Sequence, residues 1–298
     1  MISTRKHWLG LGLTAVLFLP GCWAVNFNPF TAEQEESDTF KVKDKPMIVV
    51  DTFNGAIDVT PGEKGIVEAR VTKRAGGSTQ EEAEQDLENI KVTMRPEGDK
   101  IVIKVEKTDQ SMWSSRGASV DLQVPEGTIL DVRTTNGKVN VVAITGDVKA
   151  RSSNGPIHIK GSRGKLDLTT SNGGIQTEGG TGKLDLKTSN GPIAVKSTKA
   201  VINARTSNGA IQFTGRLNDG DNSFQSSNGK IALALPSDAE FNLDATTSNG
   251  RIKSDFAVDE EEKAGKHHLR GTVGKDPKAT IKLHTSNGSI EIREQKGE

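Results

Sequence analysis

The dipeptide Asn-Gly recurs along this chain at a nearly constant interval, and this recurrence limits the fold more than any other feature. It occurs at Asn54, Asn136, Asn154, Asn172, Asn190, Asn208, Asn228, Asn249 and Asn287. The interval is 18 residues four times in succession, and then 20, 21 and 38 residues, the last being about two periods. Self-similarity at a fixed period is typical of repeat architectures, in which each unit stacks on the one before it.

The residues that follow each Asn alternate between apolar and polar types. The third residue after Asn is β-branched and apolar in every unit: Ile57, Val139, Ile157, Ile175, Ile193, Ile211, Ile231, Ile252 and Ile290. Polar residues such as His158 and Gln176 come next, and the fifth position is again mostly apolar. Alternation with a period of two indicates a strand with one buried face. Each unit therefore predicts two short strands joined by an Asn-Gly corner.

Two architectures fit this pattern, a meander of β-hairpins and a β-solenoid. Asn-Gly between alternating strands is a strong hairpin signal. However, Pro156 and Pro192 directly follow the Gly, where a two-residue hairpin needs an N–H group that proline lacks. A meander would also leave a broad apolar face uncovered, whereas a coil closes two sheets around it. The sequence therefore favours an all-β fold, a β-solenoid with about 18 residues per coil.

We expect the Ser-Asn-Gly corners to be structural. Asn and Gly tolerate positive φ and can turn the chain, and stacked Asn side chains can hydrogen-bond to each other. Ser or Thr fills both positions before Asn from residue 134 onward, and its hydroxyl can bond backbone groups. The predicted structural corners are Asn136, Asn154, Asn172, Asn190, Asn208, Asn228, Asn249 and Asn287. An alternative interpretation is that this row forms a binding stripe.

The composition of the chain changes along its length and predicts five segments. They are a signal peptide (1–21), a flexible tether (22–45), an N-terminal β or capping region (46–125), the solenoid (126–293) and a tail (294–298). The less regular capping region includes one short helix, expected from Ser78 to about Ile90, which would protect the open edge of the first coil. Asp255–His268 interrupts the repeat and is expected to be an insertion or a hairpin tip.

The N-terminus has the features of an export signal. Basic residues at positions 5–7 precede an apolar run, Trp8–Leu19, which is too short to span a bilayer comfortably. Leu19-Pro20-Gly21-Cys22 then resembles the bacterial lipoprotein signal, and Cys22 is the only cysteine. The predicted protein is exported and anchored to a membrane of the cell envelope through lipid on Cys22. Under the sorting rule that the resemblance to lipoproteins brings in, Trp23 rather than Asp after the cysteine implies the outer membrane, if the cell has one. The alternative is an ordinary secreted protein with one free thiol.

Two further motifs accompany the repeat. Val120-Asp121-Leu122-Gln123-Val124-Pro125 precedes the Asn-Gly units, and Ile281-x-Leu283-x-Thr285-Ser286-Asn287-Gly288 ends them. Together with the repeat they resemble the bacterial DUF4097 family over residues 46–293. That family is described as candidate adhesins with β-strand repeats, so the resemblance implies the same fold and an adhesive role.

The sequence contains no recognisable catalytic, metal or cofactor motif. His267 and His268 lack other ligands at a suitable spacing, so we expect no metal and no cofactor. The formal net charge is zero, which argues against nucleic acid as a partner. Asp167 and Asp185 would be neighbours on adjacent coils, which weakly resembles the paired carboxylates of glycan-cleaving enzymes. Without a cleft motif, we expect no enzymatic activity.

A column of basic residues offers a candidate binding face. It consists of Arg133, Arg151, Lys187 and Arg205, each three residues before a corner Asn. An acidic column beside it would form a ladder of ion pairs, or the cations would bind an anionic envelope polysaccharide or a surface protein. We therefore predict a surface-anchored, non-catalytic scaffold for adhesion or envelope contact. The alternatives are an envelope-stress regulator that senses a ligand and a glycan-active β-helix enzyme.

Overall fold

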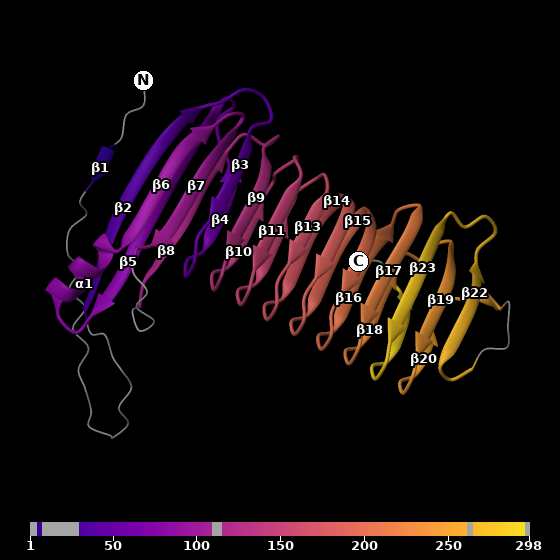
Figure 1. Cartoon of the computed structure of the whole chain (residues 1–298). Coiled ribbons are helices and arrows are strands. Elements are labelled where there is room, and N and C mark those ends of the chain that lie inside the picture. Colours follow the sequence, from indigo (N-terminus) through magenta and orange to yellow (C-terminus); the bar gives the residue numbers. More distant parts are fainter. Residues whose placement is uncertain (1–4, 8–29, 109–114, 261–264, 296–298) are drawn as a thin grey trace, which may run out of the picture.

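The protein is a β-solenoid, as the repeat predicts, with successive coils stacked into a rod (Figure 1). The computed structural model describes residues 5–7, 30–108, 115–260 and 265–295. Strands of neighbouring coils pair in parallel and in register, as Val139, Ile157 and Ile175 do at intervals of 18 residues. The apolar residues of the third position face inward and are buried in eight of the nine units, with Ile252 half-buried.

Each coil contributes one strand to each of two sheets that enclose this core. Sheet 1 contains the strands before the corners: β3 (Met47–Asp51), β9 (Ile129–Thr134), β11 (Val148–Ser152), β13 (Leu166–Thr169), β17 (Gly220–Ser226), β23 (Ala279–Thr285) and β19 (Phe241–Thr247). Sheet 2 contains the strands after the corners: β4 (Ile57–Pro61), β10 (Val139–Val142), β12 (Ile157–Lys160), β16 (Ile211–Leu217), β18 (Ile231–Leu235), β24 (Ile290–Glu294) and β20 (Ile252–Ser254). The long strands β14 (Ile175–Lys187) and β15 (Ile193–Arg205) run from sheet 2 into sheet 1.

The last coils do not stack in the order of the sequence. Strand β23 lies between β17 and β19, and β24 lies between β18 and β20. The 38-residue interval therefore does not correspond to two successive coils. The final coil (β23 and β24) lies between the coil of β17 and β18 and the coil of β19 and β20, which precedes it in the sequence. The segment after β20 makes this possible, since its strand β22 (His268–Val273) runs antiparallel to β19. It thereby brings the chain back to the end of β19 beside which β23 begins.

The segment after β20 also closes this end of the rod. Strand β21 (Asp259–Glu260) pairs with the outer edge of β22. The ring of Phe256 is buried and packs edge-on against that of Phe241, with ring centroids 5.4 Å apart. The described residues of the predicted insertion or hairpin tip, 255–260 and 265–268, are thus part of a cap that covers the last core residues and the edge of sheet 1; residues 261–264 lie outside the described ranges.

The N-terminal region extends both sheets beyond the first coil. Strands β8 (Gly117–Val124) and β5 (Ile66–Gly77) continue sheet 2 from β4. Strands β7 (Lys100–Lys107) and β6 (Ile90–Glu97) continue sheet 1 from β3.

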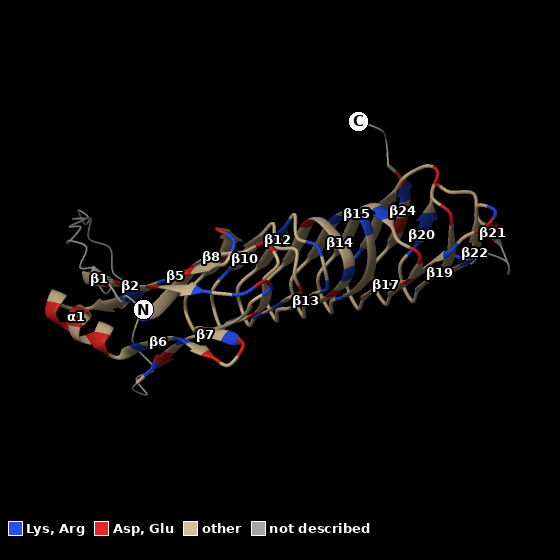
Figure 2. Ribbon diagram, turned by 90° about the horizontal axis from the view of Figure 1, so that it is seen from above, with Lys and Arg blue, Asp and Glu red and all other residues tan. Residues whose placement is uncertain are grey.

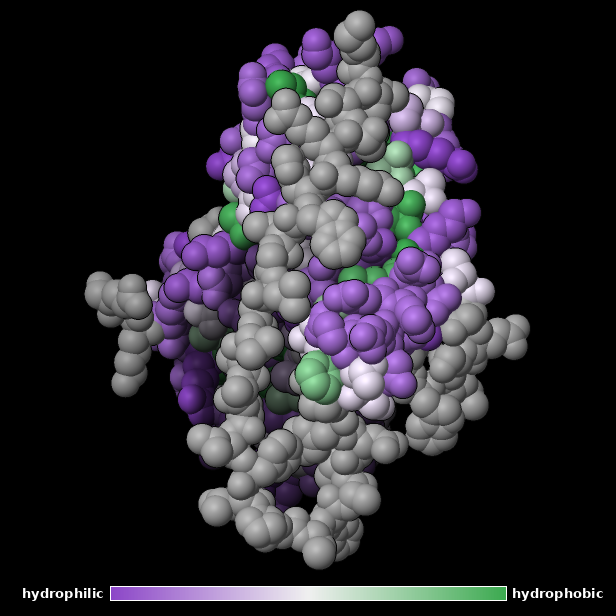
Figure 3. Space-filling model, turned by 90° about the vertical axis from the view of Figure 1, so that its left-hand side faces the viewer, coloured by the Kyte–Doolittle hydropathy of each residue, from purple (hydrophilic) through white to green (hydrophobic). Residues whose placement is uncertain are grey.

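The single expected helix joins these two extensions. It is α1 (Gln80–Glu88), and the side chain of Thr79 caps it by accepting the N–H of Glu82 at 3.1 Å. The expected helix end is two residues too long, since Ile90 begins β6. Figure 3 looks at this end of the rod, where mainly hydrophilic side chains are visible among the coloured residues.

The prediction of a tether over residues 22–45 is wrong for residues 30–41. These residues form β2 (Phe30–Lys41), which pairs antiparallel with β5 along its whole length. The acidic run that resembled a tether faces a basic strand: Glu33 contacts Arg74 at 2.5 Å, Glu35 contacts Arg70 at 3.3 Å and Glu36 contacts Lys73 at 3.0 Å. Charge complementarity across the strands and the burial of Ala32 and Phe40 hold a segment that has little hydrophobic pattern of its own.

Candidate binding faces and the corner ladder

The corner Asn residues form one continuous hydrogen-bonded column. The side-chain amide of Asn190 donates to the Oδ1 of Asn172 at 2.7 Å and its own Oδ1 accepts from Asn208 at 2.7 Å. The column follows the spatial order of the coils, since Asn287 donates to Asn228 and Asn249 donates to Asn287. Each interior amide thus uses a donor and an acceptor within the column, which gives these residues a structural function.

The corner Gly residues are needed for a different reason from the expected one. Among the described residues, neither the corner Asn nor the corner Gly has φ in the left-handed region, so the expectation of positive φ is wrong. Instead the coils approach each other too closely for a side chain. A Cβ added to Gly191 would lie 1.9 Å from the carbonyl oxygen of Gly173, and one added to Gly209 would lie 1.8 Å from that of Gly191.

The Ser or Thr two residues before each Asn points inward, and its hydroxyl forms hydrogen bonds with backbone groups at the corner. The hydroxyl of Thr188 accepts the N–H of Gly191 at 3.2 Å and donates to the carbonyl of Gly173 in the preceding coil at 2.9 Å. The buried members of this set are Thr52, Thr134, Ser152, Thr170, Thr188, Thr206, Ser226, Thr247 and Thr285. The repeated Ser/Thr is therefore explained by buried hydrogen bonds between coils.

Two buried threonines permit a direct test of this explanation. The hydroxyl of Thr177 is buried without a partner among the described residues, between Ile159 and Val195 of the neighbouring coils. We expect Thr177→Val to raise the free energy of unfolding by about 1 kcal/mol, because it removes an unsatisfied polar group. Thr188→Val should lower it by about 1–3 kcal/mol, since the N–H of Gly191 loses its acceptor. Urea denaturation of both variants measures this, and a change of the same sign in both would contradict it.

The four cations predicted as a binding face lie side by side on the outer face of sheet 1. Strand pairing aligns Arg133 with Arg151, Arg151 with Thr169, Thr169 with Lys187, and Lys187 with Arg205. Neighbouring strands are about 4.8 Å apart, so the column extends over about 19 Å. We call these four residues the basic column.

The expected ladder of ion pairs beside the basic column forms only in part. Arg151 lies 3.8 Å from Asp167, and the Nε of Arg205 donates to Gln225 at 3.0 Å. Within the described part of the chain, Arg133 and Lys187 have no carboxylate within 4.0 Å. Because Gln225 is neutral, three of the four charges have no acidic partner in this part of the chain.

The carboxylates considered for catalysis do lie on adjacent strands, since Asp167 is aligned with Asp185. Each carboxylate already has a polar partner. Arg151 lies 3.8 Å from Asp167, and the side-chain amide of Asn203 donates to Asp185 at 3.3 Å. The described residues contain no group of three or more potential metal ligands, His267 and His268 included. No helix in the described ranges has the length and apolarity that crossing a bilayer requires. Cys22 lies outside these ranges.

One carboxyl group has a perturbed pKa where sheet 2 meets its N-terminal extension. Asp121 of β8 is aligned with Asp58 of β4 on one side and with Arg70 of β5 on the other. Partial burial raises the pKa of Asp121, and the charge of Asp58 raises it further, while Arg70 opposes the shift. This junction therefore holds two like charges, which Arg70 and Lys138, 3.8 Å from Asp58, partly compensate, and no signal in the sequence indicated it.

Comparison with known proteins is consistent with this geometry. The family model described as Toastrack DUF4097 matches residues 47–293. A candidate lipid-binding protein from Parabacteroides distasonis ATCC 8503 has a similar structure, with 14% identity, a TM-score of 0.50, and coverage of 88% of this chain and 97% of that one. A candidate adhesin from Parabacteroides merdae ATCC 43184 has 13% identity, a TM-score of 0.39, and coverage of 88% and 96%.

The search for relatives among curated proteins finds no match. At such low identity the structural likeness shows the fold alone. The family model matches well over half of the chain, from the first strand of the first coil into the last strand of the solenoid. This chain therefore belongs to the Toastrack DUF4097 family.

Proposed function

We propose that this protein is a surface-anchored, non-catalytic scaffold whose solenoid presents the basic column to anionic polymers of the cell envelope. The alignment of Arg133, Arg151, Lys187 and Arg205 on four of five successive strands, with Thr169 on the middle one, is the observation that supports this function. A wall polymer or lipopolysaccharide carries repeated negative groups, and a straight row of cations matches such a chain better than an isolated charge does.

The stacked corners favour such binding by holding neighbouring coils in register. The Asn column and the buried hydroxyls connect each coil to the next, so the cations are positioned before any ligand arrives. Binding then costs little ordering of the protein, and several weak contacts act together. Because exposed charges are screened by salt, the interaction should weaken as ionic strength rises.

Charge removal from the basic column tests the proposal. We expect the variant with Gln at positions 133, 151, 187 and 205 to be retained at least about tenfold less on immobilised envelope polysaccharide at low salt, since each charged contact contributes about 0.5–1 kcal/mol. A variant with Gln in place of Lys64, Lys160, Lys196 and Lys275 removes the same charge elsewhere. Equal retention of the two variants across a salt gradient would refute the proposal, and matching melting curves would show that both are folded.

The anchor is tested separately through Cys22. Lipid attachment at this residue would hold the protein on a membrane, so Cys22→Ser should move it from the membrane fraction to the soluble fraction. Cleavage before Cys22 would also remove β1 (Arg5–His7), which pairs with the outer edge of β2. Unchanged fractionation of the Cys22→Ser protein, followed by immunoblotting of washed membranes, would show that the anchor lies elsewhere.

A further inference from the structure

A second group of cations gathers on the opposite face of the rod, at the end of sheet 2. Lys230 precedes β18, Arg251 and Lys253 belong to the corner and strand of β20, and Arg293 lies on β24. Strand order places β24 between β18 and β20, so residues far apart in the sequence become neighbours. Figure 2 shows basic residues on β20 and β24 at this end of the rod.

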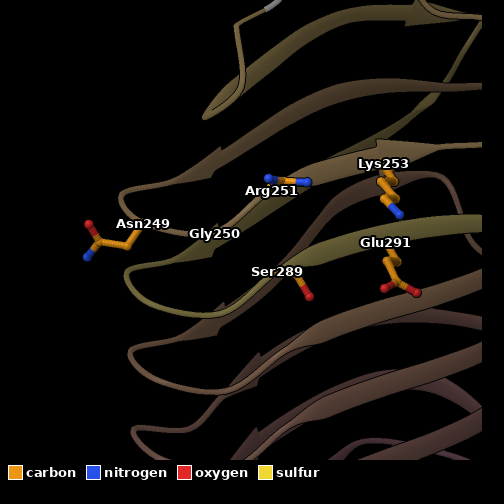
Figure 4. Close-up of a pocket in the computed structure, with 6 residues that line it drawn as sticks. All are labelled: Asn249, Gly250, Arg251, Lys253, Ser289 and Glu291. Atoms are coloured by element: carbon orange, nitrogen blue, oxygen red, sulfur yellow. The ribbon is translucent and has the colours of Figure 1, made fainter.

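The surface is hollowed at this position. A depression of about 260 Å³ is lined by Asn249, Gly250, Arg251, Lys253, Ser289 and Glu291. Figure 4 shows Arg251 and Lys253 on one strand beside Ser289 and Glu291 on the next, whereas Asn249 points outward from the corner. A second depression of similar volume adjoins it across Glu291, above the small side chains of Ala232 and Ala234.

The carboxylate in this cluster is already paired. The Nζ of Lys230 lies 2.6 Å from Glu291, and Arg293 contacts the same carboxylate from its own strand. The hydrogen bond from Lys230 lowers the pKa of Glu291, with a smaller contribution from Arg293. The Glu291 carboxylate therefore stays ionised and paired with these two cations.

The other two cations have no such partner. Arg251 and Lys253 have no carboxylate within 4.0 Å among the described residues, although Lys253 is aligned with Glu291 in the strand register. Asp255 follows β20, so the whole of that strand separates it from the corner. Lys230 and Arg293 thus share Glu291, whereas Arg251 and Lys253 are exposed beside the depression with no acidic partner among the described residues.

We propose that this depression binds a phosphate-type oxyanion, with Arg251 and Lys253 as its charged ligands and the Ser289 hydroxyl as a neutral donor. A guanidinium group binds two oxygens of such an anion at once, and an ammonium group adds a third charged contact. The depression is smaller than the 300–1,000 Å³ typical of small-molecule sites, so it suits a single anionic group. That group belongs either to a free or polymer-bound phosphate or to a phospholipid head group.

Titration of the full chain with inorganic phosphate at low ionic strength tests the site. We expect saturable binding that the double variant Arg251→Gln/Lys253→Gln weakens at least about tenfold, because two charged hydrogen-bonding groups are lost. The variant Lys160→Gln/Lys196→Gln removes the same charge from the same sheet, away from the depression, and should bind as the unmodified protein does. All four positions are exposed, so both variants should keep the melting temperature of the parent.

The source of the anion is distinguished by sedimentation with lipid vesicles. Binding to phosphatidylglycerol vesicles but not to phosphatidylcholine vesicles, lost in the Arg251/Lys253 variant, would assign the site to a lipid head group. Phosphate binding without vesicle binding would assign it to a free or polymer-bound phosphate. The proposal is overturned if the unmodified protein binds neither probe saturably, or if the Arg251/Lys253 variant binds as well as the control variant. Because the basic column lies on the other sheet, its charge-removal variant should not affect either result.

Discussion

Gly191→Ala is expected to lower the free energy of unfolding by at least about 3 kcal/mol, or to prevent folding. The new Cβ would lie 1.9 Å from the carbonyl oxygen of Gly173 and 2.4 Å from its carbon. Both atoms belong to backbone that the adjacent hydrogen bonds fix in place, so no flexible side chain can move aside. Overpacking typically costs about 1–3 kcal/mol and more where the neighbour cannot relax. Urea denaturation followed by circular dichroism measures the change.

Two companion substitutions identify the cause of this effect. Gly265→Ala places a Cβ where no atom of the described residues lies within 4 Å, so it should change stability by less than about 0.5 kcal/mol. Gly191→Asn separates steric exclusion from backbone preference, because Asn adopts positive φ more readily than Ala. If close approach is the cause, Asn is tolerated no better than Ala. A stable Gly191→Asn protein, or a Gly191→Ala protein as stable as Gly265→Ala, would contradict this account of the corner.

Asp86→Ala is expected to lower the free energy of unfolding by about 3 kcal/mol or more. Asp86 on α1 accepts two hydrogen bonds from Arg116, at 2.9 Å from Nε and 2.7 Å from Nη2. The side chain of Arg116 is only 3% exposed. Removing one partner of a buried ion pair leaves a charge that water cannot solvate well, at a cost of about 3–5 kcal/mol. The midpoint of chemical denaturation at neutral pH measures the loss.

Matched variants show whether the ion pair is responsible. Glu88→Ala removes an exposed acid from the same helix, and we expect a change of less than about 0.5 kcal/mol. The double variant Asp86→Ala/Arg116→Met removes both charges and should recover part of the lost stability, since a hydrophobic replacement of a buried pair is often neutral. Equal stability of the Asp86→Ala and Glu88→Ala proteins would show that this contact does not hold α1 in place.

The regular part of the fold was accessible from the sequence because each coil repeats the same local environment. The third position after Asn meets the same position of the next coil, so the need for a β-branched apolar residue appears in all nine units. The basic column followed from the same periodicity, and its members do become neighbours. The prediction of a tether failed for residues 30–41 because β2 is held by charges on β5, a separate strand that the local sequence of β2 does not indicate.

The second cationic group shows the limit of such reasoning most clearly. Arg251 and Arg293 are separated by a cap and a complete strand, and no periodicity relates them, since the final coil inserts beneath the preceding one. The cause of the Gly at each corner was equally hidden. Both explanations predict the same residue, and they are distinguished only by the backbone φ at the corner and by the distance between the carbonyl and the missing Cβ.

The sequence by itself determined the repeat length, the inward columns and the positions of the corners, because these depend on contacts that recur every 18 residues. The tertiary structure alone decided the order of the last coils, the caps at both ends and the clustering of Lys230, Arg251, Lys253 and Arg293. These features depend on single contacts between distant segments, such as Phe256 with Phe241 or β2 with β5. A contact made only once leaves no periodic signal in the chain.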